Sequence, residues 1–323
     1  MAAWRTVTQR VPASSVARDA VSRADRRGQM SLDLFTSGVS AEGAARRQLL
    51  DLVDGGVALS RGFGGYGRLR LRAFGGPSAA RAPSREWRGG HAGAEIGLAI
   101  RPSVDVTSTL TARALNGVGN EWFGRTAATW RMSDEVRVMA GAERVLVLDN
   151  AFSLESGLAA TGAVVGARWQ PSTSGSVEAS ARRLAMSDGN ARTQLRVDAS
   201  RRLWHRVHEF RLVGASEYLA HDETTTRYFS PASFWRHDLG LEGRRWLATP
   251  RFFGDRERWV SAAYLYGGDN RDVRYHTVRI GAAYEFARGA GLVAQALVVR
   301  SRVYDGGQLS AGLRFRHVPT PAR

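Results

Sequence analysis

The stretch "GRLRLRAFGG", residues 67–76, decides the fold because apolar and charged side chains alternate strictly along it. One set of alternate positions is apolar and carries Leu69, Leu71 and Ala73. The other set is cationic and carries Arg68, Arg70 and Arg72. Successive side chains of a β-strand point to opposite faces, so this pattern predicts a strand with one apolar and one charged face. Charges in a row are very costly against lipid or a dry core, so the charged face predicts a hydrated surface.

The same two-residue period continues from Gly55 to Arg316. It is clear in "EVRVMAGAERV" (135–145) and in "TVRIGAAYEF" (277–286). Short turn signals such as "SDGN" at 187 separate the runs. The spacing predicts about 15 antiparallel strands, with turns that alternate between short and long. Longer connections are expected near residues 76–90, 146–160, 219–234 and 248–256.

Two all-β architectures fit such a chain, a soluble sandwich and a transmembrane barrel. A sandwich core needs large apolar side chains in bulk, whereas the apolar faces here are rich in alanine. A barrel in an outer membrane covers the apolar faces with lipid, leaves no open edge and encloses the charged faces around water. We therefore predict an all-β, antiparallel up-and-down transmembrane β-barrel over residues 55–317, with a tail at 318–323. Such barrels have an even strand number, so about 16 strands are expected, with about 14 as the alternative.

Large aromatic residues lie near the ends of the predicted strands, where a membrane barrel carries its interfacial girdles. Trp122 and Trp130 share one face and are separated by eight residues. At about 3.3 Å per residue they lie roughly 26 Å apart along the strand, which a tilt of about 40° reduces to roughly 20 Å of membrane depth. A sandwich could also hold two such tryptophans. The residues predicted at the membrane interface are Trp122, Trp130, Tyr284, Phe286 and Phe315.

Residues 1–54 do not share the two-residue period. The segments "PASSVARDAVSRADRRG" (12–28) and "SAEGAARRQLLDLVDGG" (40–56) have the capping residues and spacing of two short helices. We therefore expect a helical arm, or the remnant of a periplasmic repeat region, before the barrel. The N-terminus lacks the apolar core of a signal peptide, which taken alone favours a soluble protein.

The chain is strongly basic, with a formal net charge of +16, 46 basic residues that are all arginine, and 30 acidic residues. This balance indicates an anionic partner such as an acidic polymer, lipid headgroups or nucleic acid. There is no cysteine, which excludes disulfides, thiolate metal sites and a cysteine nucleophile. No apolar run is long enough for a transmembrane helix.

Many of the arginines fall on the predicted inner face of the barrel. The predicted pore-lining residues are Arg68, Arg70, Arg72, Arg113, Arg125, Arg131, Arg137, Arg196, Arg279 and Arg314. Fewer acids fall on that face, namely Asp105, Glu143, Asp198 and Glu285. Such a lining attracts anions and repels cations. The alternative is a structural network of arginine–acid pairs that only rigidifies the wall.

No cofactor or metal site is predicted from the remaining polar residues. His237 and Asp238 are adjacent, so a strand directs them to opposite faces. The spacing of His205 and His208 likewise separates these two side chains across faces. A barrel hydrolase is the first alternative function, with Ser230 or Ser233 beside His237. A soluble basic β-protein that binds nucleic acid is the second. It requires aromatic rings interleaved with the arginines, whereas here they cluster at strand ends, so no nucleic-acid partner is expected.

The segment "RYFSPASFWRHDLGLEGRRWL" (227–247), followed by "AAYLYGGDNRDVRYHTVRIGAAYEF" (262–286) and a final hairpin, resembles a known family. It is similar to the C-terminal barrel domains of exopolysaccharide export porins, the cellulose-type and poly-N-acetylglucosamine-type outer-membrane proteins that carry tetratricopeptide repeats in front of the barrel. The resemblance covers about 90 residues; the rest of the match is architecture.

The resemblance implies a Gram-negative outer-membrane barrel of 16 strands that exports a nascent polysaccharide or another anionic or neutral polymer. It also implies outer-membrane lipid, periplasmic repeat proteins and an inner-membrane synthase as partners. If the repeats belong to this protein, the chain is a fragment or begins at a wrongly assigned Met1, and the signal peptide belongs to an upstream part.

Overall fold

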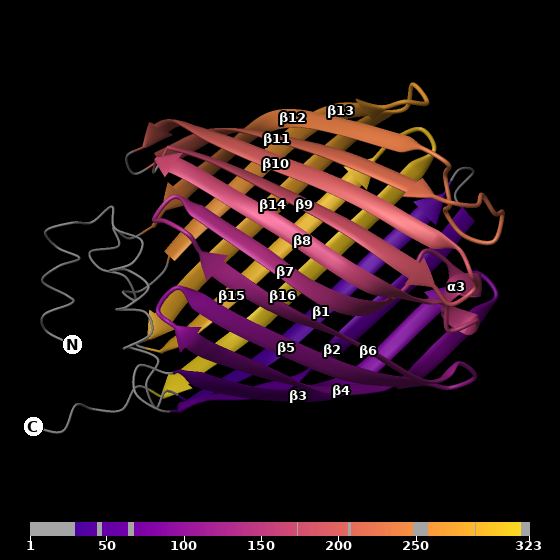
Figure 1. Ribbon diagram of the computed structural model, residues 1–323, viewed down its shortest axis with the longest axis horizontal. Coiled ribbons are helices and arrows are strands. Elements are labelled where there is room, and N and C mark those ends of the chain that lie inside the picture. The colour runs from indigo at the N-terminus through magenta and orange to yellow at the C-terminus, as the bar shows by residue number, and fades with distance from the viewer. Residues whose placement is uncertain are drawn as a thin grey trace, which may run out of the picture.

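The computed structural model describes residues 30–43, 47–63, 68–172, 174–205, 208–247, 258–287 and 289–317. Within these residues, 16 antiparallel strands close into one barrel in which each strand pairs with its neighbours in the chain (Figure 1). The strands are β1 (Met30–Gly43), β2 (Arg47–Phe63), β3 (Leu69–Ala82), β4 (Arg85–Arg101), β5 (Val104–Leu115), β6 (Gly119–Arg131), β7 (Val136–Leu146), β8 (Ala159–Ser172), β9 (Gly175–Met186), β10 (Ala191–His205), β11 (His208–His221), β12 (Phe234–Trp246), β13 (Arg258–Asp269), β14 (Arg274–Ala287), β15 (Ala290–Arg300) and β16 (Tyr304–His317). A short helix, α3 (Ala151–Glu155), interrupts the connection between β7 and β8.

The barrel closes where the first strand meets the last. β1 pairs with β16 over its whole length, from Met30 opposite His317 to Gly43 opposite Tyr304. This closure confirms the predicted antiparallel barrel of 16 strands. The period-two pattern from Gly55 onward corresponds to the second part of β2 and all later strands, and β1 supplies the remaining strand.

The structure corrects the expected start of the barrel. Of the segment 40–56, expected to be helical, residues 40–43 lie in the end of β1 and residues 47–56 lie in β2, so the barrel begins at Met30 instead of Gly55. Residues 44–46 lie outside the described residues. Without these strands, the backbone N–H and C=O groups at the edges of β3 and β16 would have no partners, which is very costly inside a bilayer. The other expected helix, 12–28, and the tail at 318–323 lie outside the described residues.

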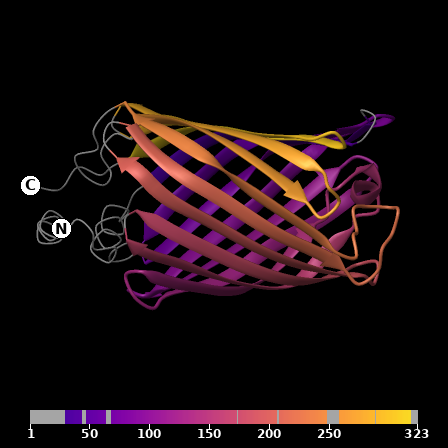
Figure 2. The same ribbon diagram turned by 90° about the horizontal axis from the view of Figure 1, so that it is seen from above.

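The two ends of the barrel differ, as Figures 1 and 2 show. The described chain begins and ends at one end, which we call the termini end. The opposite end, called the loop end, carries α3 and the connection 222–233 between β11 and β12. Long connections were expected at both of these places, but the one expected at 76–90 is wrong because β3 and β4 are joined by a tight turn at 83–84. In the described part of the chain no helix is long and apolar enough to cross a membrane.

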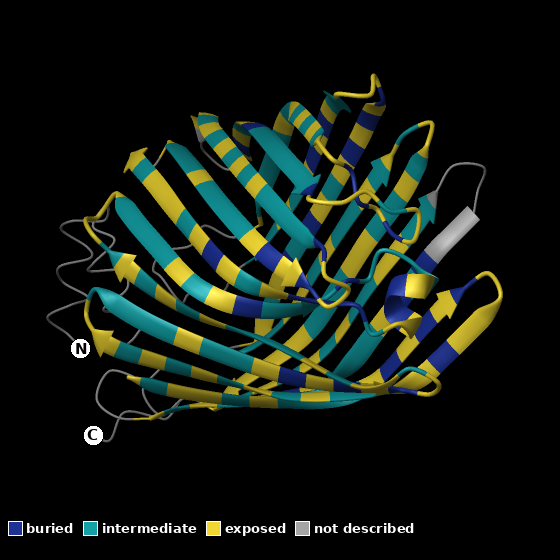
Figure 3. Ribbon diagram, turned by 45° about the vertical axis from the view of Figure 1, so that its right-hand side comes forward, coloured by how far each residue is buried: buried dark blue, intermediate teal, exposed yellow. Residues whose placement is uncertain are grey.

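The two faces of the sheet have opposite chemistry. In β4, Ile96, Leu98 and Ile100 are 50%, 43% and 54% exposed, on the side away from the interior. Glu95 lies on the other face, directly opposite Arg72 of β3 and Thr109 of β5. Figure 3 shows the resulting alternation of exposed and less exposed residues along the strands. The outer face is therefore apolar and the inner face polar, as the alternation in the sequence predicted.

Paired glycines allow β2 and β3 to approach closely on the inner face. A Cβ atom on Gly56 would lie 2.3 Å from the carbonyl oxygen of Gly75. A Cβ atom on Gly76 would lie 2.1 Å from the carbonyl oxygen of Gly55. The backbones occupy the space that side chains would need, which is how glycine permits a local bend in a curved sheet.

Candidate functional site

The inner wall of the barrel holds most of the arginines singled out in the sequence. Its sidedness follows from Arg113, Glu143 and Glu209, charged residues that are nearly inaccessible and that share a face through the strand register. Arg68 immediately precedes β3, and the other predicted pore-lining residues occupy inner-face positions in strands: Arg70, Arg72, Arg113, Arg125, Arg131, Arg137, Arg196, Arg279 and Arg314. The strand register places these arginines on the inner wall. That they act on a transported solute stays a prediction.

Acids on neighbouring strands pair with many of these arginines. Glu95 lies 3.7 Å from Arg70 and 3.9 Å from Arg72. Glu143 lies 3.9 Å from Arg125 and 3.4 Å from Arg182. The Glu143 contacts link three strands laterally, because Arg125 and Glu143 are register partners on β6 and β7, and Arg182 belongs to β9. The structural network that the sequence left open as an alternative therefore exists on this part of the wall.

Further pairs continue the network around the barrel. Arg196 of β10 lies 2.6 Å from Asp198 on its own strand and 3.7 Å from Glu217 of β11. Arg314 of β16 lies 2.7 Å from Asp33 of β1 and so bridges the closing seam. The wall is thus lined by guanidinium and carboxylate groups together, with arginine in excess in the sequence as a whole.

An enclosed ion pair joins β2 to β5 towards the loop end. An Nη atom of Arg113 lies 2.6 Å from Asp54, whose other carboxylate oxygen accepts a 2.6 Å hydrogen bond from the Ser78 hydroxyl. The His91 ring nitrogen lies 3.8 Å from the same carboxylate. Arg113 also stacks over the Phe123 ring at 5.3 Å. The side chain of Arg113 is only 7% exposed, so this pair is largely removed from water.

Glu209 is the centre of a second cluster at the termini end. It is 2% exposed, contacts the guanidinium of Arg211 and lies 3.5 Å from Arg202. Its register partner on β12 is Arg244, whose guanidinium lies 4.8 Å from the centre of the Trp259 ring. One carboxylate thus neutralises two arginines that face each other across β10 and β11.

The connection containing α3 packs onto the inner wall at the loop end. Leu154 of α3 is buried against side chains of the neighbouring strands, namely Leu50, Leu52, Ala80, Ala82, Trp87 and Leu115. Arg85 of β4 holds Glu155 at 3.0 Å. The Asn150 side chain caps α3 and donates a 2.7 Å hydrogen bond to the carbonyl oxygen of Arg227 in the 222–233 connection. The two long connections are therefore tied to each other and to the wall.

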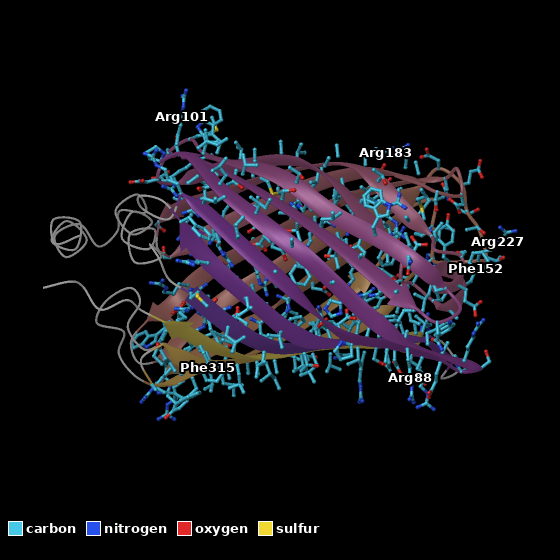
Figure 4. The ribbon with its side chains drawn as sticks, turned by 90° about the horizontal axis from the view of Figure 1, so that it is seen from below. Arg88, Arg101, Phe152, Arg183, Arg227 and Phe315 are labelled. Carbon is cyan, nitrogen blue, oxygen red and sulfur yellow. The ribbon has the colours of Figure 1, made fainter. Side chains whose placement is uncertain are left out.

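Asp149 adds an ionic contact to this loop-end cover. Its carboxylate lies 3.2 Å from Arg192 of β10. Burial raises the pKa of the Asp149 carboxyl above its ordinary value, and the nearby Arg192 opposes that shift. Figure 4 shows Phe152 and Arg227 at this end, with the Arg227 guanidinium 5.6 Å from the Phe152 ring centre.

The five aromatic residues predicted at the membrane interface lie on the outer face. Trp122 and Trp130 are 55% and 50% exposed and occupy opposite ends of β6. Tyr284, Phe286 and Phe315 are also exposed and lie towards the termini end, where Figure 4 marks Phe315. The guanidinium of Arg144 lies 4.6 Å from the Trp122 ring centre, which places a cation beside that ring on the outer face. Their contact with headgroups stays a prediction.

The residues considered for catalysis are not brought together. The His237 ring is within 2.9 Å of the Ser216 hydroxyl on the outer face, whereas Asp238 lies 3.0 Å from Arg236 on the inner face, so the predicted separation of the two is confirmed. Ser230 is buried in the 222–233 connection, where its hydroxyl donates to the Thr225 carbonyl oxygen. The backbone of Ser233 accepts a hydrogen bond from Asn270.

Metal ligands were not expected, and the described residues contain no group of three or more side chains suited to hold a metal ion. Other acids that organise the wall were not predicted from the sequence, chiefly Asp54, Glu95, Glu209 and Glu217. Asp54 was missed because its segment was assigned to a helix. No local pattern places Asp54 on the inner wall, because Leu50 and Leu52 share its face and are buried there under Leu154.

A closed antiparallel barrel with an apolar exterior and a charged interior is the architecture of a transmembrane β-barrel. A family model described as the PgaA membrane beta barrel domain matches residues 68–248. Because this match spans more than half of the chain, the protein belongs to that family. It is an outer-membrane β-barrel.

One of the similar solved structures shares the fold. The structure described as "Bacterial polysaccharide outer membrane secretin" matches with a TM-score of 0.69 and 14% sequence identity, covering 88% of this chain and 98% of that one. OpdO of Pseudomonas aeruginosa matches with a TM-score of 0.45 and 12% identity over 92% of this chain and 99% of its own. OprD of the same organism matches with a TM-score of 0.45 and 11% sequence identity, covering 92% of this chain and 98% of its own. A search of curated proteins finds no match.

Proposed function

We propose that this outer-membrane barrel exports a polysaccharide through an interior lined by arginine. Membership of the PgaA barrel family supports export, and the similar solved barrel is described as a polysaccharide secretin. In outer-membrane barrels the longer loops face the cell exterior, so the polymer would enter at the termini end and leave at the loop end. The periplasmic repeat proteins and the inner-membrane synthase implied by the family resemblance would supply it.

The observation that carries this proposal is the composition of the inner wall. Its guanidinium groups provide hydrogen-bond donors and its carboxylates provide acceptors, and the hydroxyl groups of a sugar use both. The lateral pairs also fix the positions of the charges, as Glu143 does between Arg125 and Arg182. Along a wall of fixed polar groups, a hydrated polysaccharide can exchange one hydrogen-bond partner for the next as it moves. No single side chain binds the polysaccharide strongly enough to hold it at one place.

Aromatic rings accompany the charges on part of the wall. Phe35 of β1 and Phe74 of β3 flank the His91 ring, with ring centres 6.0 and 6.3 Å away. All three positions are on the inner face. Flat rings next to charged donors give a sugar both an apolar and a polar contact, which favours a carbohydrate over a simple ion as the transported species.

Planar-bilayer recordings of the purified protein test the proposal. Under a salt gradient we expect the reversal potential of an anion-selective path, and we expect neutral cello-oligosaccharide added on the termini side to reduce the current reversibly. Because the 147–158 connection covers part of the loop end, the same recordings are made with Leu154→Ala, which weakens its docking. Cation selectivity, or no conductance from either protein, would contradict the proposal.

A further inference from the structure

One arginine lies on the lipid-facing side of the barrel near the loop end. Arg144 of β7 is the register partner of Gly124 on β6 and of Thr161 on β8. Its neighbour in the chain, Glu143, belongs to the charge network of the inner wall, so Arg144 lies on the outer face. A charged side chain on the lipid face of a barrel is unfavourable, and the cost falls towards the membrane interfaces. What Arg144 contacts at that interface therefore decides whether its position is favourable.

The side chain of Arg144 extends from the apolar band towards the interface. Its register partner Gly124 is two residues further from the loop end than Trp122. At about 3.3 Å per residue and a tilt of about 40°, the Cα atom of Arg144 is roughly 5 Å deeper in the membrane than that of Trp122. The guanidinium nevertheless contacts Trp122. Long basic side chains extend in this way when their charged ends reach the headgroup region.

Neighbouring groups hold the guanidinium of Arg144 in place. Its Nε atom donates a 3.1 Å hydrogen bond to the carbonyl oxygen of Trp122, and its central carbon atom lies 4.6 Å from the centre of the Trp122 ring. Its Nη1 atom lies 3.5 Å from the Thr161 hydroxyl. Within the described part of the chain, Nη2 has no hydrogen-bond partner. The site therefore offers donors on a guanidinium that is already oriented, which lowers the entropy cost of binding a ligand.

The lipid-facing side of β5 to β9 is positively charged. The strand register places every acid of these five strands on the inner face, namely Asp105, Glu121, Glu143 and Glu178. The register places two arginines of the same strands, Arg144 and Arg183, on the outer face. An anion that meets this part of the barrel from the membrane is attracted and meets no opposing carboxylate of these strands.

The two outward arginines differ in how their charge is met. The guanidinium of Arg183 lies 2.6 Å from Asp222, in the connection between β11 and β12, and donates a 2.6 Å hydrogen bond to the Thr193 hydroxyl. Figure 4 marks Arg183 near the loop end. Arg144 forms no ion pair with an acid among the residues that the structure describes. Arg183 is thus neutralised within the protein, whereas Arg144 is left for an anion from outside it.

We infer that Arg144 and Trp122 bind the phosphate group of a phosphorylated lipid in the outer leaflet. The longer loops of such barrels face the exterior, so the loop end meets that leaflet. Lipid phosphates lie at the headgroup level, where tryptophan rings of membrane proteins also lie. A guanidinium gives a phosphate charge-assisted hydrogen bonds, and the acyl chains of the same lipid cover the apolar face below it. This site goes beyond the proposed export function, because it lies outside the pore.

Native mass spectrometry of the whole chain released from detergent tests the inference. The protein is titrated with diphosphoryl lipid A and, in parallel, with the same lipid after removal of its phosphates. The test variant is Arg144→Gln. The matched control is Arg183→Gln, which removes a guanidinium from the same face where Asp222 already neutralises it. Heat-dependent gel mobility checks that each variant forms a folded barrel.

We expect Arg144→Gln to bind diphosphoryl lipid A about fivefold more weakly than the unaltered protein, as for the loss of one basic residue near a charged lipid surface. Arg183→Gln should bind within about twofold of the unaltered protein, because its charge is already paired. The dephosphorylated lipid should bind equally to the unaltered protein and to Arg144→Gln.

Three results would overturn the inference: no binding of diphosphoryl lipid A by the unaltered protein, equal binding by the unaltered protein and Arg144→Gln, or an equal loss in Arg183→Gln. A loss in Arg144→Gln that is the same for the dephosphorylated lipid would refute recognition of the phosphate. Arg144 is not on the pore wall, so Arg144→Gln should conduct like the unaltered protein in planar-bilayer recordings. Failure of the lipid site and failure of the export proposal are therefore read from separate measurements.

Discussion

The buried Asp54–Arg113 pair gives a quantitative test of how dry the wall is near the loop end. Asp54→Ala removes the acceptor of the 2.6 Å contact and of the Ser78 hydrogen bond, and so takes away the ion-pair partner of Arg113. Removing one partner of a buried pair costs about 3–5 kcal/mol. The Phe123 ring retains part of the stabilisation of Arg113, so we expect the lower value, about 3 kcal/mol, which is roughly a hundredfold change in the folding equilibrium.

Urea-induced unfolding from lipid vesicles, followed by tryptophan fluorescence, measures this loss of unfolding free energy. The matched control is Asp33→Ala, because Arg314 is also held at 2.7 Å but its side chain is 47% exposed. The exposed Arg314 stays hydrated when Asp33 is removed, so no buried charge is left unpaired and the control should lose less than about 1 kcal/mol. The double variant Asp54→Ala with Arg113→Met should recover most of the loss, because it leaves no buried charge. Equal losses for Asp54→Ala and Asp33→Ala would refute the claim that this pair is shielded from water.

Two further predictions concern the outer face and the loop end. In variants that keep a single tryptophan, brominated lipid should quench the fluorescence of Trp122 or Trp130 at least twofold more strongly than that of Trp87. Trp87 is fully buried on the inner side. Equal quenching of all three would mean that the apolar face does not contact lipid. Leu154→Ala should reduce the local stability of the 147–158 connection by about 3 kcal/mol, because a buried leucine loses its packing. Hydrogen exchange should become faster in that connection and stay unchanged in the strands, and uniform acceleration would contradict local docking.

The barrel was predictable from the sequence because its side-chain period is a local property. The alternation at 67–76 and 277–286 assigns each residue to a face without any knowledge of its neighbours, and the observed faces agree. The start of the barrel was not predictable in the same way. The segment 40–56 contains leucines that suit either a helix or a strand, and its pairing partner β16 lies at the other end of the chain.

The wall chemistry was predictable only in part. The inner positions of Arg72 and Arg125 follow from alternation, but their pairing with Glu95 and Glu143 depends on the register between strands. A shift of one residue would place every side chain on the other face, and turn lengths alone do not fix the shift. The pairing of Arg137 with both Arg131 and Arg168 likewise depends on register and cannot be seen in the local sequence.

The seam between β1 and β16 sets the order of assembly. Asp33 and Arg314 are separated by 281 positions in the chain, yet they lie on adjacent strands. Contacts between such distant residues are the slowest to form, so the cylinder stays an open sheet until its first and last strands meet. A chain truncated at any point between β1 and β16 would form an open sheet, with unpaired backbone N–H and C=O groups along both of its edges. We therefore expect truncated products to aggregate or be degraded before they could make the membrane leaky.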